Sequence, residues 1–453
     1  MNFNNKIRVP GRFQNMAFIT GMALFALLLF YPLLNPDRCL FSTDDNLGII
    51  PAMKNMMPQG FLSYWSEAPF VGSPGGRVPI MWTPIFLWLA PARFGFNWIH
   101  ALDLILASVA LALFLRAAGL HWPAIVLGVI TAFWVGSNLT LTYAGHTGKF
   151  AVLMCAAASL YGIRKTFESD RPWLWSIVTG GFVGFMFLEQ QDVALFFGLF
   201  LGAYALFRSM LQKGMRLKKL LLFIPMGMVV LIMSGAALML VYSQNVSAVT
   251  AQREDDPRQK WEFATQWSWP PEESIDFIAP GYMGWRSHEA DGPYWGRMGR
   301  SPGWEKTNQG FMNFKLENQY LGAIPVMLAL FAVFVALSGF RLYGDGNNFS
   351  LGRAGQPVPP LISVGQGCPI IPLTDAKAEI IFWFCAAVLA LLLSFGKYFP
   401  LYQLFYQLPV MGNIRNPNKF LQVFQLAAGI LAAYGTHLIF NWRNVCSDKD
   451  VIS

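Results

Sequence analysis

Two adjacent carboxylates, Asp44 and Asp45, follow the first strongly apolar stretch of the sequence, residues Met22 to Leu34. Paired carboxylates can act as a general base or hold a hard cation such as Mg²⁺ or Mn²⁺. No third ligand is evident beside them in the sequence. A structural interpretation also fits, because Ser42 or Thr43 followed by acids is typical of a helix N-terminus. The doublet alone leaves both interpretations open.

Four basic or imidazole side chains are candidates to face the doublet. His146 and Lys149 lie in GHTGKF, and Arg415 and Lys419 lie in RNPNK just before the last apolar run. Lysine and arginine bind phosphate, and histidine can relay a proton. Lys149, Arg415 and Lys419 could instead anchor their helices at the membrane interface. Together with the doublet, they predict a site with an acidic wall and a basic wall that suits a phosphate or pyrophosphate headgroup arriving from the lipid.

A polar turn and two tryptophans complete the candidate site. The turn contains Glu189, Gln190 and Asp192 between two apolar runs, and it is either a solvated hairpin tip or part of a polar or acceptor pocket. Trp267 and Trp269 belong to an aromatic-rich segment, residues 243–318. Aromatic faces stack on sugar rings, but they also serve lipid interfaces and partner docking.

The composition places the whole chain in a bilayer. Of the 453 residues, 55% are hydrophobic and 13% are charged, whereas soluble domains carry about 25% charged residues. The five cysteines form no CxxC pair, so neither a disulfide framework nor a zinc site is indicated. The net charge of +8 is not clustered along one segment, and no nucleic-acid partner is expected.

Apolar runs of membrane-spanning length predict an all-α polytopic membrane protein with about ten transmembrane helices. The predicted spans are residues 15–34, 98–116, 122–141, 149–165, 172–190, 192–209, 218–242, 319–338, 378–396 and 419–440. Residues 79–91 contain two prolines inside an apolar run and predict a re-entrant or interfacial helix.

The distribution of Lys and Arg predicts cytoplasmic N- and C-termini, because the short basic loops then all face the cytoplasm. This topology divides the chain into an N-terminal bundle of seven spans (1–242), an extracytoplasmic aromatic-rich loop (243–318), C-terminal membrane helices (319–440) and a tail (441–453). The cytoplasmic loop 339–377 is rich in Gly and Pro and is predicted to be irregular. The acidic doublet, GHTGKF and RNPNK then share the extracytoplasmic side.

Several longer motifs resemble a known family. AGHTGKF, ATQWSWPPEESIDFIAPGYMG, YWGRMG and FGKYFPLYQLFYQLPVMGNIRNPNKF, with the acidic first outer loop, resemble bacterial YfhO-like membrane proteins of the GT-C glycosyltransferase superfamily. The resemblance covers residues 15 to 440. It implies a bacterial inner-membrane enzyme that transfers sugar from a polyprenyl-phosphate donor, with Asp44 or Asp45 as base or metal ligand. This chain ends one helix after RNPNK, where family members are often longer.

The sequence is therefore consistent with three functions. The first is glycosyl transfer to a glycan, lipid or protein acceptor. The second is a non-catalytic subunit of a larger membrane assembly, docked through residues 243–318. The third, a transporter of lipid-linked glycans, is less favoured because most predicted spans are apolar through their middles. Membrane lipids and the lipid-linked donor are the expected partners, together with other membrane subunits under the second hypothesis.

Overall fold

The computed structural model describes most of the chain. The described residues are 11–40, 54–62, 65–66, 73–74, 80–211, 216–250, 256–284, 295–298, 300, 304–307, 319–338, 340–345, 348–353, 373–409 and 411–447. Within them, helices predominate and two short antiparallel strand pairs are present. The acidic doublet, Asp44 and Asp45, lies outside the described residues.

Helices cover all ten of the predicted apolar runs. They are α1 (Gly11–Leu29), α4 (Ala92–Ala117), α5 (Trp122–Phe133), α6 (Gly136–Ala144), α7 (Thr147–Glu168), α8 (Pro172–Glu189), α9 (Gln191–Leu211), α11 (Phe223–Thr250), α14 (Ala323–Leu337), α15 (Leu373–Ser394) and α17 (Phe420–Ser447). In the described part of the chain, six helices are long and apolar enough to cross a bilayer, or seven if α5 and α6 form one span. Apolar helices in this number indicate a multi-pass membrane protein.

Shorter elements connect these helices. They are η1 (Tyr31–Leu34), η2 (Gln59–Phe61), β1 (Trp65–Ser66), β2 (Ser73–Pro74), α3 (Trp82–Leu89), α10 (Arg216–Leu221), α12 (Pro257–Ala264), η3 (Pro271–Phe277), α13 (Trp304–Thr307), β3 (Phe340–Asp345), β4 (Asn348–Arg353), η5 (Gly396–Tyr398), α16 (Pro400–Tyr406), η6 (Met411–Asn413) and η7 (Pro417–Lys419). The short helix predicted within residues 79–91 is α3.

Two sequence expectations need correction. The run 122–141 is not one continuous helix, because α5 and α6 are bent by 48° at a break between them. The Asn138 side-chain amide donates to the Phe133 carbonyl at 2.9 Å, so a polar side chain compensates for the broken helical ladder. The loop 339–377 is not irregular throughout, since β3 and β4 pair with Phe340 opposite Arg353. The sequence DGNN between these strands is a hairpin signal.

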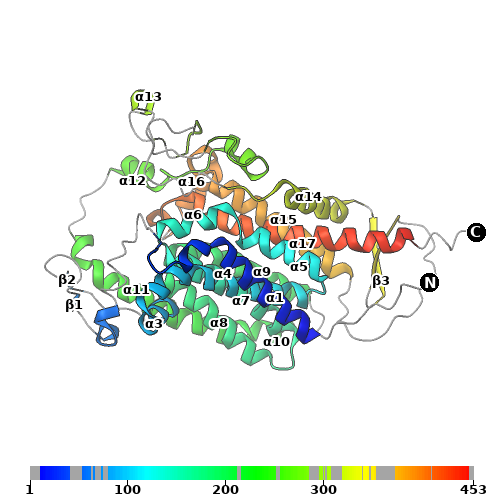
Figure 1. The fold of residues 1–453 in the computed structure, drawn as a ribbon, viewed down its shortest axis with the longest axis horizontal. Coiled ribbons are helices and arrows are strands. Elements are labelled where there is room, and N and C mark those ends of the chain that lie inside the picture. The colour runs from blue at the N-terminus through cyan, green and yellow to red at the C-terminus, as the bar shows by residue number, and fades with distance from the viewer. Residues whose placement is uncertain are drawn as a thin grey trace, which may run out of the picture.

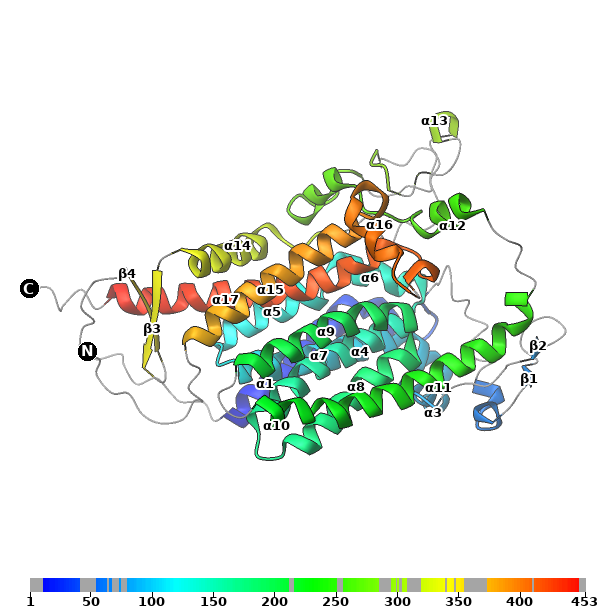
Figure 2. The ribbon, with the colours of Figure 1, turned by 180° about the vertical axis from the view of Figure 1, so that it is seen from behind.

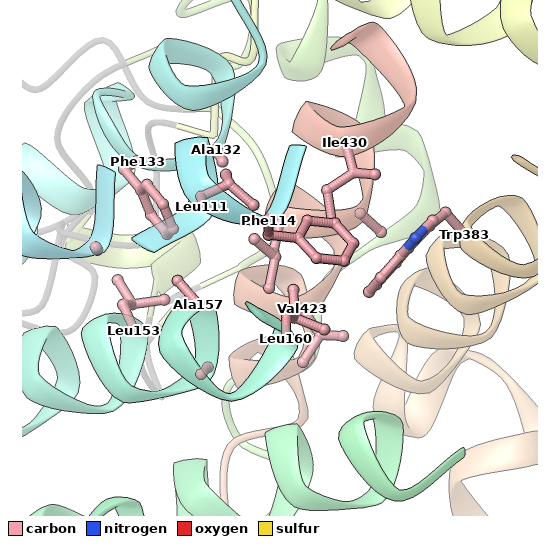
Figure 3. Close-up of a cluster of buried hydrophobic side chains, with 14 of the residues drawn as sticks. Leu111, Phe114, Ala132, Phe133, Leu153, Ala157, Leu160, Trp383, Val423 and Ile430 are labelled. Atoms are coloured by element: carbon pink, nitrogen blue, oxygen red, sulfur yellow. The ribbon is translucent and has the colours of Figure 1, made fainter. Parts of the chain in front are cut away.

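The apolar core lies where α4, α5, α7, α15 and α17 meet. Figure 3 shows side chains from these five helices packed together: Leu111 and Phe114, Ala132 and Phe133, Leu153, Ala157 and Leu160, Trp383, and Val423 and Ile430. Small residues allow the closest approaches. A Cβ atom on Gly128 of α5 would lie 2.8 Å from the Gly429 carbonyl oxygen of α17. Such small-residue contacts are typical of membrane helices.

The helices run roughly along the long axis of the molecule (Figure 1). The start of α1 and the end of α17 lie at the same end, together with β3 and β4. The short elements α12 and α16 and the β1–β2 pair lie towards the other end (Figures 1 and 2). We call these the terminal end and the distal end. An even number of bilayer crossings would place the termini together in this way.

Candidate functional site

A small polar pocket lies at the start of α17, beside α6 and α7. Its lining residues are Ser137, Asn138, Leu141, Lys149, Gln319, Asn418, Lys419, Leu421, Gln422 and Gln425. The cavity itself is about 20 Å³, which is room for about one water molecule. Two of the predicted phosphate-binding residues, Lys149 and Lys419, therefore meet here although they lie far apart in the sequence.

The GHTGKF motif places Lys149 in the pocket through its two glycines. Gly145 ends α6 with a φ of 83°, a left-handed conformation that favours glycine. Gly148 lies so close to the turn after α8 that a Cβ atom would be 2.9 Å from the Glu189 carbonyl oxygen. The first turn of α7 therefore packs directly against the polar turn, and Lys149, only 6% exposed, lies inside the bundle.

Lys419 is positioned by contacts between the segments ATQWSW (residues 264–269) and RNPNK (residues 415–419). The Asn416 backbone N–H donates to the Ala264 carbonyl at 2.8 Å, and the Asn418 backbone N–H donates to the Trp267 carbonyl at 3.2 Å. Asn416 has a φ of 70°, which turns the chain into η7. TQWSW and RNPNK thus form one backbone-bonded unit that fixes the start of α17 at the pocket.

The charges of the pocket are partly compensated within the chain. Lys419 forms an ion pair with Asp192 of the polar turn. Lys149 also interacts favourably with the Asp192 carboxylate. Two ammonium groups therefore share one carboxylate, and these three groups carry a net charge of +1. A positive charge in partly desolvated surroundings is suited to an anionic oxygen, such as that of a phosphate group.

Side-chain amides form the rest of the pocket. The Gln425 amide donates to the Ser137 hydroxyl and, at 3.1 Å, to the Gln319 side-chain oxygen. Three amide side chains each have at least one buried polar atom that has no hydrogen-bond partner in the described structure: Asn138, Asn418 and Gln422. Unpartnered buried polar atoms are costly, so their concentration at one place is typical of a site that binds water or a ligand.

The amides of α17 were not among the sequence-predicted site residues. Asn418, Gln422 and Gln425 recur at helical spacing at the start of an otherwise apolar run, so they share one face. This pattern was visible in the sequence and could have identified the face of α17 that lines the pocket.

The other acid of the polar turn has a structural partner. Glu189 accepts a hydrogen bond from the Thr83 backbone amide at 3.0 Å and so caps the start of α3. Next to it, the Trp82 indole donates to Asp103 at 2.7 Å, and Asp103 is fully buried. Gln190 is the residue that ends α8. The polar turn is therefore packed between helices and is not a solvated hairpin tip.

Other predicted site residues lie away from the polar pocket. Arg415 is exposed, and its guanidinium lies 5.2 Å from the centre of the Phe263 ring. His146 precedes α7 and is half-buried outside the pocket lining. Trp269 is fully buried and stacks on Phe277, while Trp267 is 8% exposed. The faces of these two tryptophans belong to the protein core and are not open to a sugar.

The predicted metal ligands, Asp44 and Asp45, lie outside the described residues. Among the residues that the structure does describe, no group of three or more His, Cys, Asp or Glu side chains could hold a metal ion. The doublet therefore stays a sequence-based prediction. The polar pocket described above consists of basic and amide side chains together with Ser137 and two leucines.

A second buried polar cluster lies towards the terminal end. Glu379 of α15 accepts hydrogen bonds from Arg208 at 2.9 Å, Tyr204 at 2.9 Å and Trp383 at 3.1 Å. Arg208 also pairs with Glu168 of α7. Arg208 lies in the last turn of α9. Because its side chain is 1% exposed, it is an interior charge that ties α7, α9 and α15 together.

Comparisons with protein-family models, with curated proteins and with solved structures find no match for this chain.

Proposed function

We propose that this protein is a membrane glycosyltransferase that takes a sugar from a polyprenyl-phosphate donor. The observation that carries the proposal is the meeting of Lys149 and Lys419 among amide side chains, three of which have buried atoms without a hydrogen-bond partner in the described structure. A donor delivered from the bilayer presents a phosphate at this depth. Positive charge placed beside that phosphate stabilises it as it departs.

The proposed reaction forms one bond and breaks one bond at the anomeric carbon. The acceptor hydroxyl attacks this carbon, its proton passes to Asp44 or Asp45, and the bond from the carbon to the phosphate oxygen breaks. The polyprenyl phosphate leaves with the electron pair of that bond, and its negative charge is balanced by the lysines. Attack opposite the leaving group gives inversion. The extracytoplasmic location of the site and the GT-C-like arrangement of ten spans belong to the same proposal.

The size of the pocket sets a requirement on donor binding. A cavity of about 20 Å³ does not hold a phosphate group, so the Lys419 and Gln422 side chains must rotate outward when the donor arrives. Lys419 must then exchange part of its contact with Asp192 for contact with the phosphate.

A second candidate function is that of a non-catalytic subunit of a membrane assembly. The neutralisation of Lys419 by Asp192 and the burial of Trp269 favour it, because both features serve packing without any ligand. Under this hypothesis, residues 243–318 form a docking surface and no donor is consumed.

Donor consumption separates the two candidates. Protein reconstituted in lipid nanodiscs is given a series of radiolabelled polyprenyl-phosphate sugars, and the release of polyprenyl phosphate is measured. Asp44→Asn and Asp45→Asn are tested beside Asp170→Asn, a control at an exposed acid between α7 and α8.

Loss of a general base lowers the rate by about 10²–10⁴-fold, so at least one doublet variant should show a loss of this size. Asp170→Asn should retain full turnover. If the wild-type protein consumes no donor, or if both doublet variants are fully active, the transferase proposal is wrong. Co-purification of fixed partners that survives the doublet substitutions would then support the second candidate.

A further inference from the structure

An apolar groove of about 660 Å³ lies between α1, α3 and α4, outside the polar pocket. Its floor includes the small residues Ala26 and Ala101, which are buried. Its rim includes Leu27, Leu34 and Phe94, which are exposed. The volume falls in the range of about 300–1,000 Å³ that is typical of sites for small ligands.

One lining residue of this groove is a cation that makes no ion pair with the acids in the described part of the chain. Arg93, in the first turn of α4, is exposed and donates from Nε to the Arg38 carbonyl at 3.4 Å. One of its terminal nitrogens donates to the Asn35 carbonyl at 2.5 Å. Within the described ranges, no carboxylate lies within ion-pair distance of Arg93. Because a guanidinium has five N–H donors, at least two remain available to an incoming anion.

The surroundings of Arg93 add to the positive charge. Arg38 contributes its carbonyl to the Arg93 contact and carries its own exposed guanidinium. Lys54 lies at the end of α3, where its ammonium donates to the Trp88 carbonyl at 2.8 Å. Two cations, Arg93 and the Lys54 ammonium at the Ala90 carbonyl, therefore lie near Pro91, which also lines the groove. A groove with an apolar body and a cationic end matches a lipid with an apolar chain and an anionic headgroup.

We propose that this groove is a specific binding site for an anionic glycerophospholipid of the bilayer. One acyl chain lies along Ala26 and Ala101, and the headgroup phosphate accepts hydrogen bonds from the free nitrogens of Arg93. The assignment to a bilayer phospholipid follows from the apolar lining of the groove, which is formed largely by the apolar helices α1 and α4, and from the guanidinium of Arg93 in that lining. This site is independent of glycosyl transfer, and it would exist in a non-catalytic membrane subunit as well.

Native mass spectrometry of the full-length protein tests the proposal. Delipidated protein in detergent is titrated with phosphatidylglycerol, with phosphatidylcholine of the same chain length, with a polyprenyl phosphate and with inorganic phosphate. One phosphatidylglycerol should bind about five- to tenfold more tightly than phosphatidylcholine, since one nearby basic residue contributes about this factor. Inorganic phosphate should not displace it, because the chain supplies most of the affinity.

Two substitutions locate the site, each with a matched control. Arg93→Gln keeps hydrogen-bond donors but removes the charge, so it should abolish the preference for phosphatidylglycerol. Its control is Arg171→Gln, at an exposed arginine between α7 and α8. Ala23→Trp fills the groove from α1 and should lower the affinity for both phospholipids by more than tenfold. Its control is Ala17→Trp, at an exposed position two turns earlier on α1 that does not line the groove.

Unfolding temperatures of the four variants, measured in the same detergent, show that each is folded. Equal binding of the two phospholipids by the wild-type protein would overturn the proposal, and so would unchanged binding in Ala23→Trp. Tighter binding of the polyprenyl phosphate, with competitive loss of phosphatidylglycerol, would overturn the phospholipid assignment and make the groove a site for isoprenoid chains. Displacement by inorganic phosphate alone would reduce it to an anion site.

Discussion

At the scale of single residues, this protein keeps several charges in places where water is scarce. Lys149 and Lys419 face one polar pocket. Asp103 lies buried and Glu189 half-buried beside α3, and Glu379 lies between helices towards the terminal end. A charge in such surroundings is expensive unless it is paired or serves a ligand. Substitutions at these residues therefore give large effects that are easy to measure.

The ion pair between Lys419 and Asp192 should contribute measurably to stability. Asp192→Asn leaves Lys419 without its acid and Lys149 beside it, so we expect a loss of about 1–3 kcal/mol. The measurement is a double-mutant cycle of Asp192→Asn and Lys419→Gln in denaturant unfolding of the reconstituted protein. Additive effects of the two substitutions would show that the pair does not interact.

Asp276 should make the distal elements more stable in mild acid. Burial raises the pKa of the Asp276 carboxyl to about 6, although one of its oxygens accepts a hydrogen bond from the Met283 amide at 3.2 Å. Because the folded protein holds this proton more tightly than the unfolded chain, the stabilising contribution is complete below about pH 4. It is lost as the pH rises from about 4 to about 6.

The substitution Asp276→Asn tests this pH dependence. It keeps an acceptor for the Met283 amide and removes the charge, so the variant should gain about 1–2 kcal/mol over the wild-type protein at pH 7. At pH 4 the advantage should vanish. Melting temperatures of both proteins between pH 4 and pH 7 give this difference directly, and a constant offset across the range would contradict the assignment.

At the scale of elements, two kinds of contact hold the helices together. One is the close approach of backbones at glycines, as between α5 and α17. The other is the buried ionic cluster that joins α7, α9 and α15 through Glu379. Each kind of contact predicts a different response to substitution.

Gly435 should not tolerate even one added methyl group. A Cβ atom there would lie 2.0 Å from the Leu328 carbonyl oxygen of α14, and the backbone must shift to relieve this clash. We expect Gly435→Ala to cost about 1–3 kcal/mol of unfolding free energy. The control is Gly227→Ala in α11, where no atom lies within 4 Å and where helix propensity alone should give a neutral or slightly stabilising effect. Equal effects of the two variants would contradict the packing argument.

Glu379 should be far more important than an exposed acid. Glu379→Gln leaves Arg164 and Arg208 with Glu168 as their remaining acidic partner, and we expect a loss of about 3–5 kcal/mol in unfolding of the reconstituted protein. Glu262→Gln removes the partner of Arg258 in an exposed pair, and it should cost less than about 1 kcal/mol. Similar losses for both variants would show that the cluster contributes no more than a surface pair.

Helix positions were largely predictable from the sequence, and their interruptions were not. Apolar periodicity and length place a helix at every predicted span, because membrane helices must satisfy their backbone hydrogen bonds internally. At the break between α5 and α6, the Asn138 side chain donates a hydrogen bond to the Phe133 carbonyl in place of a helical backbone N–H. Hydropathy averaged over a span-length window does not reveal such a local substitution. The β3–β4 hairpin was missed because the glycines and prolines of the whole loop outweighed one turn signal.

At the scale of the whole molecule, the site could be predicted only in part. GHTGKF and RNPNK were chosen for their basic residues, and Lys149 and Lys419 do share a pocket. Arg415 was chosen on the same grounds, but it lies exposed against Phe263. The position of a residue a few places before a helix does not tell which way its side chain points. For Arg415 and Lys419, that direction is set by the backbone hydrogen bonds of Asn416 to Ala264 and of Asn418 to Trp267.

The arrangement of the two ends gives a topology prediction. The terminal end should face the cytoplasm, which places the distal end outside. In a variant whose other four cysteines are Ser, exposed Cys39 should react with a membrane-impermeant thiol reagent in intact spheroplasts. A cysteine introduced by Asp170→Cys should react only after permeabilisation. The reverse pattern would invert the topology and move the polar pocket to the cytoplasmic side.

The most direct test of the proposed function is the affinity of the polar pocket for the donor phosphate. The dissociation constant of a labelled polyprenyl-phosphate sugar is measured for the wild-type protein and for two variants that each carry one substitution in α7. Lys149→Met changes the pocket end of α7, and Lys165→Met changes the far end, where the ammonium lies over the Tyr161 ring. The account predicts about tenfold weaker binding for Lys149→Met and no change for Lys165→Met. Equal affinities for the wild-type protein and Lys149→Met would contradict it.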